Sequence, residues 1–334
     1  MRRLGTLILI LSGLISSAVA QQDPMFTKYM FNALVYNPAY AGSNEHMSIG
    51  LLHRSQWWEL EGAPTTQTLT LHTPLANNRV GLGFSILNDR IGPTNTLSAQ
   101  ASYAYRIPLG NGKLAIGLQA GLTNWRADWT KLDFENPQPD PSFDETPNYW
   151  MPNFGAGVYY STEKFFVGFA SPHLVEHDLR RQNITDDYTN YARTYRHYFL
   201  SAGGVIPLNG KALMFRPILL VKNVGWFSEL RKDQDRQNIK APTEFDIDLS
   251  LLFFERFWLG TAFRSSIEVF DNERSSYDSA DIWASYFMPN GLRIGAAFDY
   301  PLTQLNTVTA GAFEIIVGYE FNYQSKKIVT PRYF

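Results

Sequence analysis

The sequence contains no cysteine. This absence excludes disulfide bonds, cysteine-ligated metal sites and thiol catalysis. The sequence also lacks an excess of one charge, since 29 lysine and arginine residues stand against 31 aspartate and glutamate residues. A nucleic-acid-binding protein needs a basic surface, so that class of protein is not expected. After residue 21 there is no apolar run long enough for a transmembrane helix.

The N-terminus has the three parts of a secretory signal peptide. A basic MRR precedes the apolar stretch LGTLILILSGLIS, and Ala18-Val19-Ala20 forms a small-residue cleavage site. The pattern predicts a signal peptide over residues 1–20, cleaved between Ala20 and Gln21. The alternative, an anchor helix that stays on the protein, is disfavoured because the apolar run is short for a membrane span. An exported chain without a helical span is either soluble or an outer-membrane barrel.

From residue 46 onward, apolar side chains recur at every second position. In KLAIGLQAGL at residues 113–122, one face of an extended chain carries Leu114, Ile116 and Leu118, while the other face carries only small or uncharged residues. We predict an all-β, transmembrane, antiparallel up-and-down β-barrel over residues 46–323, with the leucine face toward lipid. About fourteen strands are expected, over residues 46–57, 66–76, 79–88, 96–109, 112–125, 150–161, 164–171, 196–208, 211–222, 243–254, 256–268, 278–288, 291–301 and 308–323.

The connections between these strands alternate in length. Tight turns such as 209–211 follow the even-numbered strands, and longer connections such as 89–95 and 126–149 follow the odd-numbered ones. This alternation is typical of an outer-membrane barrel with periplasmic turns and extracellular loops. Tryptophans also gather beside the long connections, as expected at a membrane interface. They are Trp57, Trp58, Trp125, Trp129, Trp150 and Trp226.

The segment before the barrel, residues 21–45, has a helical pattern over residues 23–36. Asp23 and Pro24 fit a helix start, and Pro38 closes the segment. We expect the segment either to plug the barrel or to pack beneath its periplasmic mouth; many glycines on the inward faces would leave room for a plug. The candidate plug residues are Met25, Phe26, Tyr29, Met30 and Leu34. Residues 324–334 are expected to form a periplasmic tail.

Several stretches resemble the PorP/SprF family of outer-membrane proteins of the Bacteroidota. They are QDPMFTKYMFNALVYNPAYAGS (22–43), RSQWWELEGAPTTQTLTLHTPL (54–75), NNRVGLGFSILNDRIGPTNT (77–96), PNFGAGVYY (152–160), FERFWLGTAFR (254–264) and the terminal TPRYF. The resemblance implies a barrel tied to the type IX secretion system and gliding motility. It also implies partners: type IX secreted cargo or the C-terminal domain of an adhesin, and periplasmic secretion or peptidoglycan-linked components.

The motif RSQWWELEGAP at residues 54–64 is the most specific candidate contact site. If Trp57 faces lipid, strand alternation directs Arg54 and Gln56 into the lumen near the outer rim, where Arg54 could pair with a carboxylate such as Glu61. One interpretation is a partner-binding rim. The other is a structural ion pair in the lumen, flanked by interfacial tryptophans. The candidate rim comprises Arg54, Gln56, Trp57, Trp58, Glu61, Trp125, Trp129, Trp150 and Trp226.

Sites for metals, cofactors or catalysis have little support. His173 and His177 have the i, i+4 spacing of zinc ligands but no evident third ligand. The acidic clusters at 140–145, 185–187 and 233–235 do not match the calcium loop of an EF-hand. The histidines His46, His53, His72 and His197 lie on predicted strands without a readable triad order, and G-x-S-x-G is absent. We therefore predict no catalytic, cofactor-binding or metal site.

These observations predict a multi-pass outer-membrane barrel with periplasmic termini and extracellular long loops. It would anchor surface proteins of the type IX secretion system, or support their export, by binding cargo and linking to periplasmic machinery. Three alternatives stay open: a transporter or channel for small hydrophobic solutes, a barrel enzyme and a secreted soluble β-protein.

Overall fold

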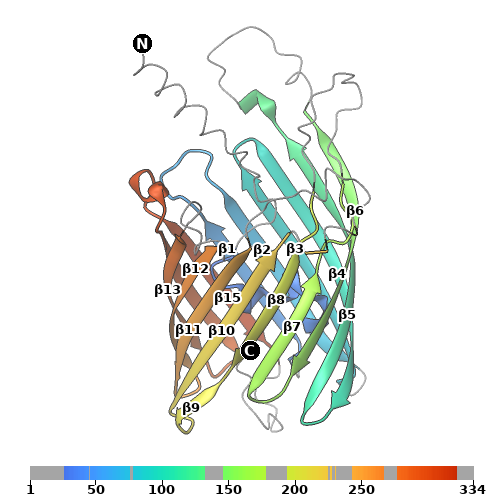
Figure 1. Cartoon of the computed structure of the whole chain (residues 1–334), viewed down its shortest axis with the longest axis vertical. Helices are drawn as coiled ribbons and strands as arrows, with labels where there is room; N and C mark the ends of the chain where they lie inside the picture. Colours follow the sequence, from blue (N-terminus) through green and yellow to red (C-terminus); the bar gives the residue numbers. More distant parts are fainter. Residues whose placement is uncertain are drawn as a thin grey trace, which may run out of the picture.

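The strands of the protein form one antiparallel sheet that closes into a barrel (Figure 1). The computed structural model describes residues 26–44, 46–75, 78–131, 146–177, 194–224, 226–227, 230, 243–266 and 277–321. The strands are β1 (Ser48–Ser55), β2 (Thr65–Leu75), β3 (Val80–Ile91), β4 (Thr94–Leu109), β5 (Gly112–Ala127), β6 (Asn148–Ser161), β7 (Phe165–Ser171), β8 (Tyr198–Gly204), β9 (Ile206–Asn209), β10 (Leu213–Asn223), β11 (Glu244–Phe253), β12 (Phe257–Ser266), β13 (Tyr277–Phe287), β14 (Leu292–Pro301) and β15 (Ala312–Glu320).

The barrel has fourteen spanning strands, which confirms the predicted fold class and strand number. β8 and β9 are two parts of one strand interrupted at Val205, and both pair with β10. β1 pairs with β15 and β10 pairs with β11, so the sheet has no free edge in the described residues. Closure satisfies the backbone N–H and C=O groups that hydrocarbon cannot satisfy.

One expected long connection is a tight turn. The segment 89–95 was expected to be a loop, but β3 continues to Ile91 and β4 begins at Thr94, which pairs with it. Only Gly92 and Pro93 connect the two strands, and Gly92 has the positive φ of 53° that a sharp reversal requires. The polar residues that suggested a loop belong to the sheet; Asp89, for example, accepts a 2.5 Å hydrogen bond from Thr66.

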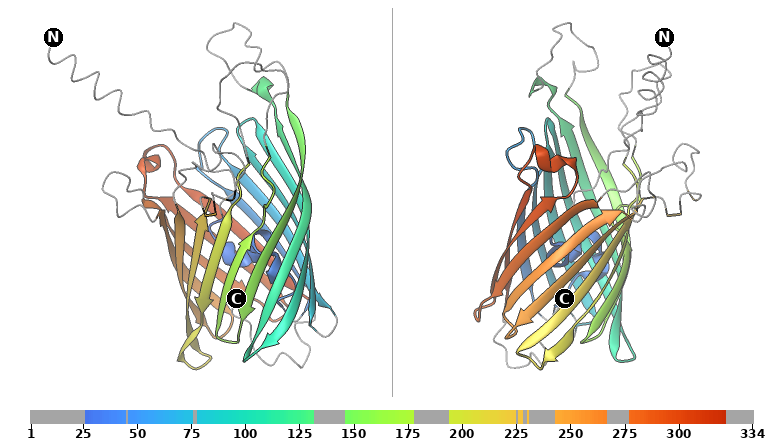
Figure 2. Two further views of the ribbon diagram at one scale, coloured as in Figure 1. Left: turned by 45° about the vertical axis from the view of Figure 1, so that its right-hand side comes forward. Right: turned by 60° about the vertical axis from the view of Figure 1, so that its left-hand side comes forward.

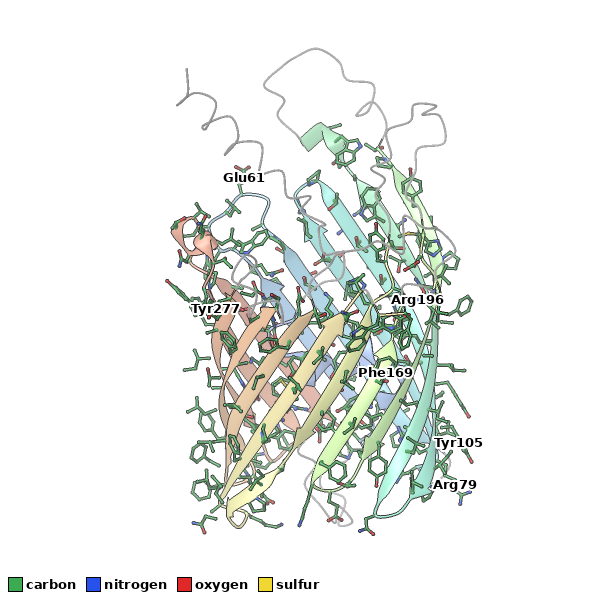
Figure 3. The ribbon with its side chains drawn as sticks, in the orientation of Figure 1. Glu61, Arg79, Tyr105, Phe169, Arg196 and Tyr277 are labelled. Carbon is green, nitrogen blue, oxygen red and sulfur yellow. The ribbon has the colours of Figure 1, made fainter. Side chains whose placement is uncertain are left out.

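The other connections alternate in length as expected, so the short ones lie at one end of the barrel and the long ones at the other. We call the end with the short connections the turn side and the other end the loop side. Figure 3 shows Glu61 at the loop side and Arg79 at the turn side. The longest strands, β4, β5 and β6, rise beyond their neighbours on the loop side (Figure 1). Since about 10 tilted residues span a bilayer, the 16-residue β4 and β5 extend past it.

The two faces of the sheet have the predicted environments. Leu118 is 60 % exposed on the outside of the barrel, whereas the adjacent Gln119 is 5 % exposed and faces the lumen. Leu82, Phe84 and Ile116 share the outer face. The outside of the cylinder is therefore a hydrocarbon-compatible surface, and the polar and small residues lie within.

An arginine on the outer face should destabilise the inserted barrel. We expect Leu118→Arg to lower the free energy of unfolding by about 2–4 kcal/mol, because a charge near mid-bilayer loses its hydration. Urea unfolding from lipid vesicles measures this change. Leu109→Arg is the matched control, because Leu109 is exposed at the turn-side end of β4 and a charge there should cost only about 0–1 kcal/mol. Equal effects at both positions would contradict the lipid-facing assignment.

The N-terminal segment lies inside the barrel as short helical turns (Figure 2). These are η2 (Tyr29–Asn32), α2 (Ala33–Tyr36) and η3 (Pro38–Tyr40), which confirms the predicted short N-terminal helical segment; its described residues form successive 3-10 and α-helical turns instead of one long α-helix. The reason is competition for hydrogen bonds: the backbone N–H groups of Thr27 and Lys28 donate to Glu314 of the wall instead of entering a helix. Residues 1–25, including Asp23, Pro24, Met25 and the cleavage site, and the tail 324–334 lie outside the described residues.

Candidate functional site

The N-terminal segment, residues 26–44, crosses the lumen from the loop side to the turn side. The carbonyl of Phe26 accepts a 2.8 Å hydrogen bond from Arg264, near the loop-side end of β12. Asn44, at the other end, donates a 2.7 Å bond to Ser48 at the turn-side start of β1. Of the candidate plug residues, Tyr29, Met30 and Leu34 are buried. The segment therefore packs within the cylinder and not beneath its mouth.

Glycines on the lumen face let the backbone of this segment approach the wall. A Cβ on Gly117 would overlap the backbone of Ala39, and one on Gly81 would overlap the carbonyl of Ala41. Gly157 leaves space in the same way for the side chain of Asn37, whose Nδ2 donates to a wall carbonyl at 3.2 Å. The inward glycines of β3, β5 and β6 thus form a surface fitted to residues 37–41.

A valine at Gly117 should loosen the segment from the wall. We expect Gly117→Val to destabilise the barrel by about 1–3 kcal/mol, the range for overpacking a filled interior. Thermal unfolding of the purified protein, followed as loss of its compact form on unboiled gels, measures the change. Gly318→Val is the control, because a Cβ there meets only ordinary contacts from 3.5 Å outward. A larger effect at Gly318 than at Gly117 would contradict the fit.

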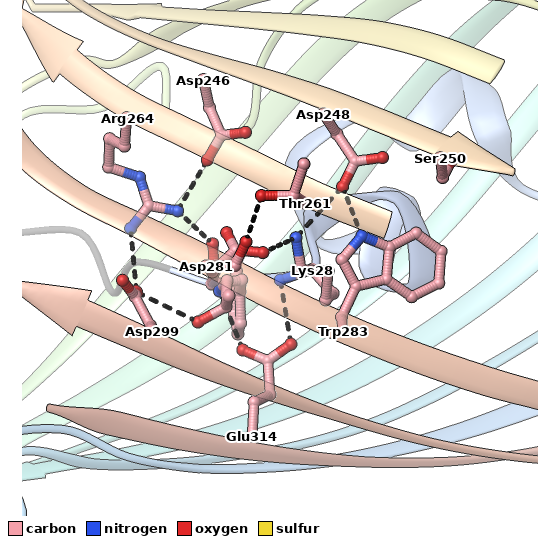
Figure 4. A network of polar contacts seen from close by, with 12 residues as sticks. Lys28, Asp246, Asp248, Ser250, Thr261, Arg264, Asp281, Trp283, Asp299 and Glu314 are labelled. Carbon is pink, nitrogen blue, oxygen red and sulfur yellow. Dashed lines mark hydrogen bonds and ion pairs between the residues drawn. The ribbon is translucent and has the colours of Figure 1, made fainter. Parts of the chain in front are cut away.

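A buried network of charges holds the first residues of the segment to the opposite wall (Figure 4). Lys28 Nζ lies 3.1 Å from Asp248 Oδ2 and 2.5 Å from Asp281 Oδ1, and the Lys28 side chain is fully buried. Trp283 Nε1 donates to the same Asp248 oxygen at 2.7 Å. Because a buried ammonium is stable only with close counter-charges, β11 and β13 fix the position of Lys28.

Arg54 lies in this network and not at the rim. Its Nη2 is 3.1 Å from Asp299, and its Nη1 is 3.7 Å from Glu314. The expected pairing with Glu61 is wrong, because Arg54 is 2 % exposed within the lumen while Glu61 is exposed at the loop-side rim (Figure 3). Arg54 therefore supports the N-terminal segment, since Glu314 also accepts the backbone N–H groups of Thr27 and Lys28.

Arg264 completes the network. Its guanidinium contacts Asp246 at 2.8 Å and Asp299 at 3.7 Å, in addition to the carbonyl of Phe26. Alternation along β11 places Asp246 and Asp248 on its polar face, but the sequence pattern does not connect them to the N-terminal segment. The available signal is Lys28 itself, the single charged residue within residues 24–44.

The connection between β1 and β2 forms a fixed shelf on the loop-side rim. Gln56 N–H donates to the Pro64 carbonyl at 2.9 Å, which closes the connection on itself. Trp58 N–H donates to the Gly311 carbonyl at 2.9 Å, and Gly92 N–H donates to the Gly62 carbonyl at 2.8 Å. These bonds tie the shelf to its neighbours on both sides, the β14–β15 connection and the β3–β4 turn.

The two tryptophans of the shelf differ from the expected arrangement. The Trp58 ring lies 6.2 Å from the ring of Phe313, which shares the outward face of β15 with the exposed Ile315. Trp58, 55 % exposed, is thus the tryptophan beside the outer surface, although alternation assigned that place to Trp57. Alternation fails because β1 ends at Ser55 and Trp57 has a φ of 49°.

The remaining rim tryptophans lie on the loop side. Trp125 stacks on Tyr149 with ring centroids 6.0 Å apart, and Trp150 is exposed on β6. The ring centroid of Trp226 lies 6.4 Å from that of Phe169. Trp129 belongs to the short 3-10 helix η4 (Trp129–Lys131). Two further tryptophans, Trp258 and Trp283, are buried in the lumen, where sequence reasoning did not place them.

Several histidines that were considered for metal binding or catalysis have other contacts. His177 pairs through Nε2 with the Pro152 carbonyl at 2.8 Å. His46 lies 2.8 Å from Glu320, and the Gly42 N–H lies 3.1 Å from Nδ1 of His72. Within the described ranges, no three histidine or carboxylate side chains are grouped as metal ligands. The acidic clusters 140–145, 185–187 and 233–235 lie outside those ranges.

Comparisons with solved structures and with curated proteins give little information about this chain. Two solved structures have low similarity to the chain. Omp33 of Acinetobacter baumannii has 9 % identity and a TM-score of 0.44, and the match covers 83 % of this chain and 99 % of Omp33. A FadL homologue of Pseudomonas aeruginosa has 13 % identity and a TM-score of 0.45, and the match covers 91 % of this chain and 96 % of the homologue. No curated protein matches. No helix among the described residues is long and apolar enough to cross a membrane.

The family comparison agrees with the barrel and its apolar outer face. The sequence model of the type IX secretion system membrane protein family PorP/SprF matches residues 18–319, nearly the whole chain. The family and the fold are those of a secretion-associated outer-membrane barrel and not of an enzyme class. The chain therefore belongs to the PorP/SprF family of type IX secretion system membrane proteins.

Proposed function

We propose that this barrel anchors type IX secreted surface proteins, or supports their export, by binding cargo at the loop side and periplasmic secretion components at the turn side. The observation that carries the proposal is a lumen occupied by the protein's own N-terminal segment, in a chain that belongs to a secretion family. A filled lumen favours a binding scaffold over a conduit. The long connections belong to one end of the barrel, and loops on a rigid scaffold are where binding residues are commonly found.

The shelf is the best-defined surface for a partner. Its backbone is held by hydrogen bonds to two neighbouring connections, so little conformational entropy is lost on binding. Trp58 and Leu60 are exposed there, and Val308 is exposed on the neighbouring β14–β15 connection. Tryptophan is one of the side chains that most often dominate interface energies. Gln56, Trp57 and Glu61 belong to the same surface, whereas Arg54 acts beneath it.

An affinity pull-down tests the proposal. The tagged full-length protein, extracted in detergent from its own cells, should recover a secreted protein that carries a type IX C-terminal domain, or a component of the periplasmic machinery. We expect Trp58→Ala to reduce recovery of the secreted protein more than tenfold, the size of a hot-spot loss. Phe154→Ala, which removes an exposed aromatic ring from the outer face of β6, is the matched control. Recovery of neither class of partner would refute the proposed function.

The orientation of the barrel can be tested with single cysteines, because the chain has none of its own. Glu61→Cys lies on the loop-side rim and Glu163→Cys lies in the β6–β7 turn. With the loops extracellular, a membrane-impermeant maleimide should label the first variant on intact cells and the second only after the outer membrane is opened. The reverse pattern would place the shelf in the periplasm.

The transporter alternative requires a passage through the lumen. Residues 26–44 occupy that space, and buried ion pairs hold them there. Solute uptake that depends on the intact barrel, without loss of a surface protein on deletion of its gene, would favour the transporter over the scaffold.

A further inference from the structure

The interior of the barrel is not completely filled. On the loop side of the N-terminal segment lies a cavity that is partly open to solvent. Tyr29 and Tyr36 of the segment line it from one side, and Leu87, Phe199 and Leu220 line it from β3, β8 and β10. Most of its wall is therefore apolar, as is usual for small-molecule sites.

The polar part of the wall contains an acceptor without a donor. Asp246 is 4 % exposed, and its Oδ2 is bound by Arg264, but its Oδ1 has no hydrogen-bond partner among the described residues. The buried hydroxyl of Tyr29 also has none there. A buried carboxylate oxygen without a donor is costly, so such a group in a cavity indicates a donor supplied from outside the chain.

The cations beside the cavity do not supply that donor. Arg264 is already bound to Asp246 Oδ2 and to the Phe26 carbonyl, and it lies 3.7 Å from Asp299. Lys28 is directed to Asp248 and Asp281. The wider network also leaves Oδ1 of Asp248 and of Asp299 without hydrogen bonds in the described part of the chain. Lys222, which also lines the cavity, does not donate to Asp246 Oδ1 either, so this oxygen has no donor in the described part of the chain.

Access to the cavity is from the loop side. Pro172 and His173, which line it, follow the loop-side end of β7, and Lys222 and Glu244 stand at the loop-side ends of β10 and β11. A ligand could therefore enter without displacement of the N-terminal segment.

We propose that the cavity binds a small cationic amphiphile, with an aromatic or aliphatic body against Tyr36, Leu87 and Leu220 and a protonated amine that donates to Asp246 Oδ1. The amine supplies the missing hydrogen bond, and the body fills the apolar space. This site is independent of the cargo-binding function proposed above, because it lies inside the barrel and not on the rim.

The probes are tryptamine and indole-3-propionate, which share the indole ring and differ in the charge at the end of the side chain. The full-length barrel in lipid nanodiscs is titrated with each by calorimetry, with empty nanodiscs as the reference. We expect saturable binding of one tryptamine per chain, at least about tenfold tighter than indole-3-propionate, as for a charge-assisted hydrogen bond. No binding of tryptamine, or equal binding of both probes, would overturn the proposal.

Two pairs of variants locate the site. Leu220→Trp fills the cavity and should abolish tryptamine binding, whereas Leu219→Trp, on the outward face of the same strand, should leave it unchanged. Should Leu220→Trp fail to fold, Leu87→Trp fills the cavity from the opposite wall, with Leu82→Trp on the outward face of β3 as its control. Binding that survives in a folded variant of Leu220 or Leu87 would place the ligand elsewhere and refute the site.

Discussion

Deletion of residues 22–44 should convert the barrel into an open, cation-preferring pore. The segment occupies the lumen, and its removal exposes a wall that carries carboxylates on β11, β13, β14 and β15. These carboxylates are Asp246, Asp248, Asp281, Asp299 and Glu314. With Asp89 they make six buried carboxylates, and once Lys28 is gone five buried cations oppose them: Arg54, Arg106, Arg216, Lys222 and Arg264. Acidic linings select cations. Planar bilayers should therefore show stable conductance steps, and a salt gradient should give a reversal potential with K⁺ several-fold more permeant than Cl⁻.

The intact chain, reconstituted in the same way, is the control and should be silent or nearly so. Heat-modifiable migration on gels shows whether the deleted variant has formed a barrel. If the deletion prevents folding, Gly117→Val provides a second test, because displacement of Ala39 should produce brief openings that the intact chain lacks. A folded deletion variant without conductance would show that the segment is not what closes the lumen.

Replacement of Lys28 by methionine should cost about 3–5 kcal/mol of unfolding free energy, the usual effect of removing one partner from a buried ion pair. The change keeps most of the side-chain volume but leaves Asp248 and Asp281 without their shared cation. Urea unfolding in lipid vesicles, followed by tryptophan fluorescence, measures the loss.

Two comparisons identify charge as the cause. Lys28→Met combined with Asp248→Asn and Asp281→Asn removes both partners and should recover most of the loss, because no buried charge is then left alone. Lys211→Met removes an exposed lysine, 3.4 Å from Glu255, and should change stability by less than about 1 kcal/mol. A triple variant no more stable than Lys28→Met would show that volume or hydrogen bonding, and not charge, explains the effect.

The rim shows where alternation stops being informative. Within β5 the sequence correctly assigns Leu118 to the outer face and Gln119 to the lumen face. Successive side chains of a strand point to opposite faces, so lipid on one face and the lumen on the other impose a period of two on the sequence. At Trp57 and Trp58 the strand has ended, and a positive φ rotates the chain. The side on which these tryptophans lie depends on hydrogen bonds to Gly311 and Thr309, about 250 residues away in the sequence.

The partners of the buried charges could not be predicted for a related reason. Arg54 was expected to pair with Glu61, its neighbour in sequence, but Asp299 and Glu314 hold it. Barrel closure places β1 beside β15, so residues from opposite ends of the chain become adjacent. Local sequence patterns contain no information on that pairing, and the network of Lys28 depends on it entirely.

The sequence by itself determined the class of fold, the strands and the surface that meets lipid, because each is dictated by a local period that the bilayer enforces. Only the tertiary structure decided what fills the cylinder. The path of residues 26–44, the glycine surface beneath Ala39 and the cavity above Tyr29 arise from contacts between distant segments. Each of these contacts exists only after the sheet has closed around its own N-terminal segment.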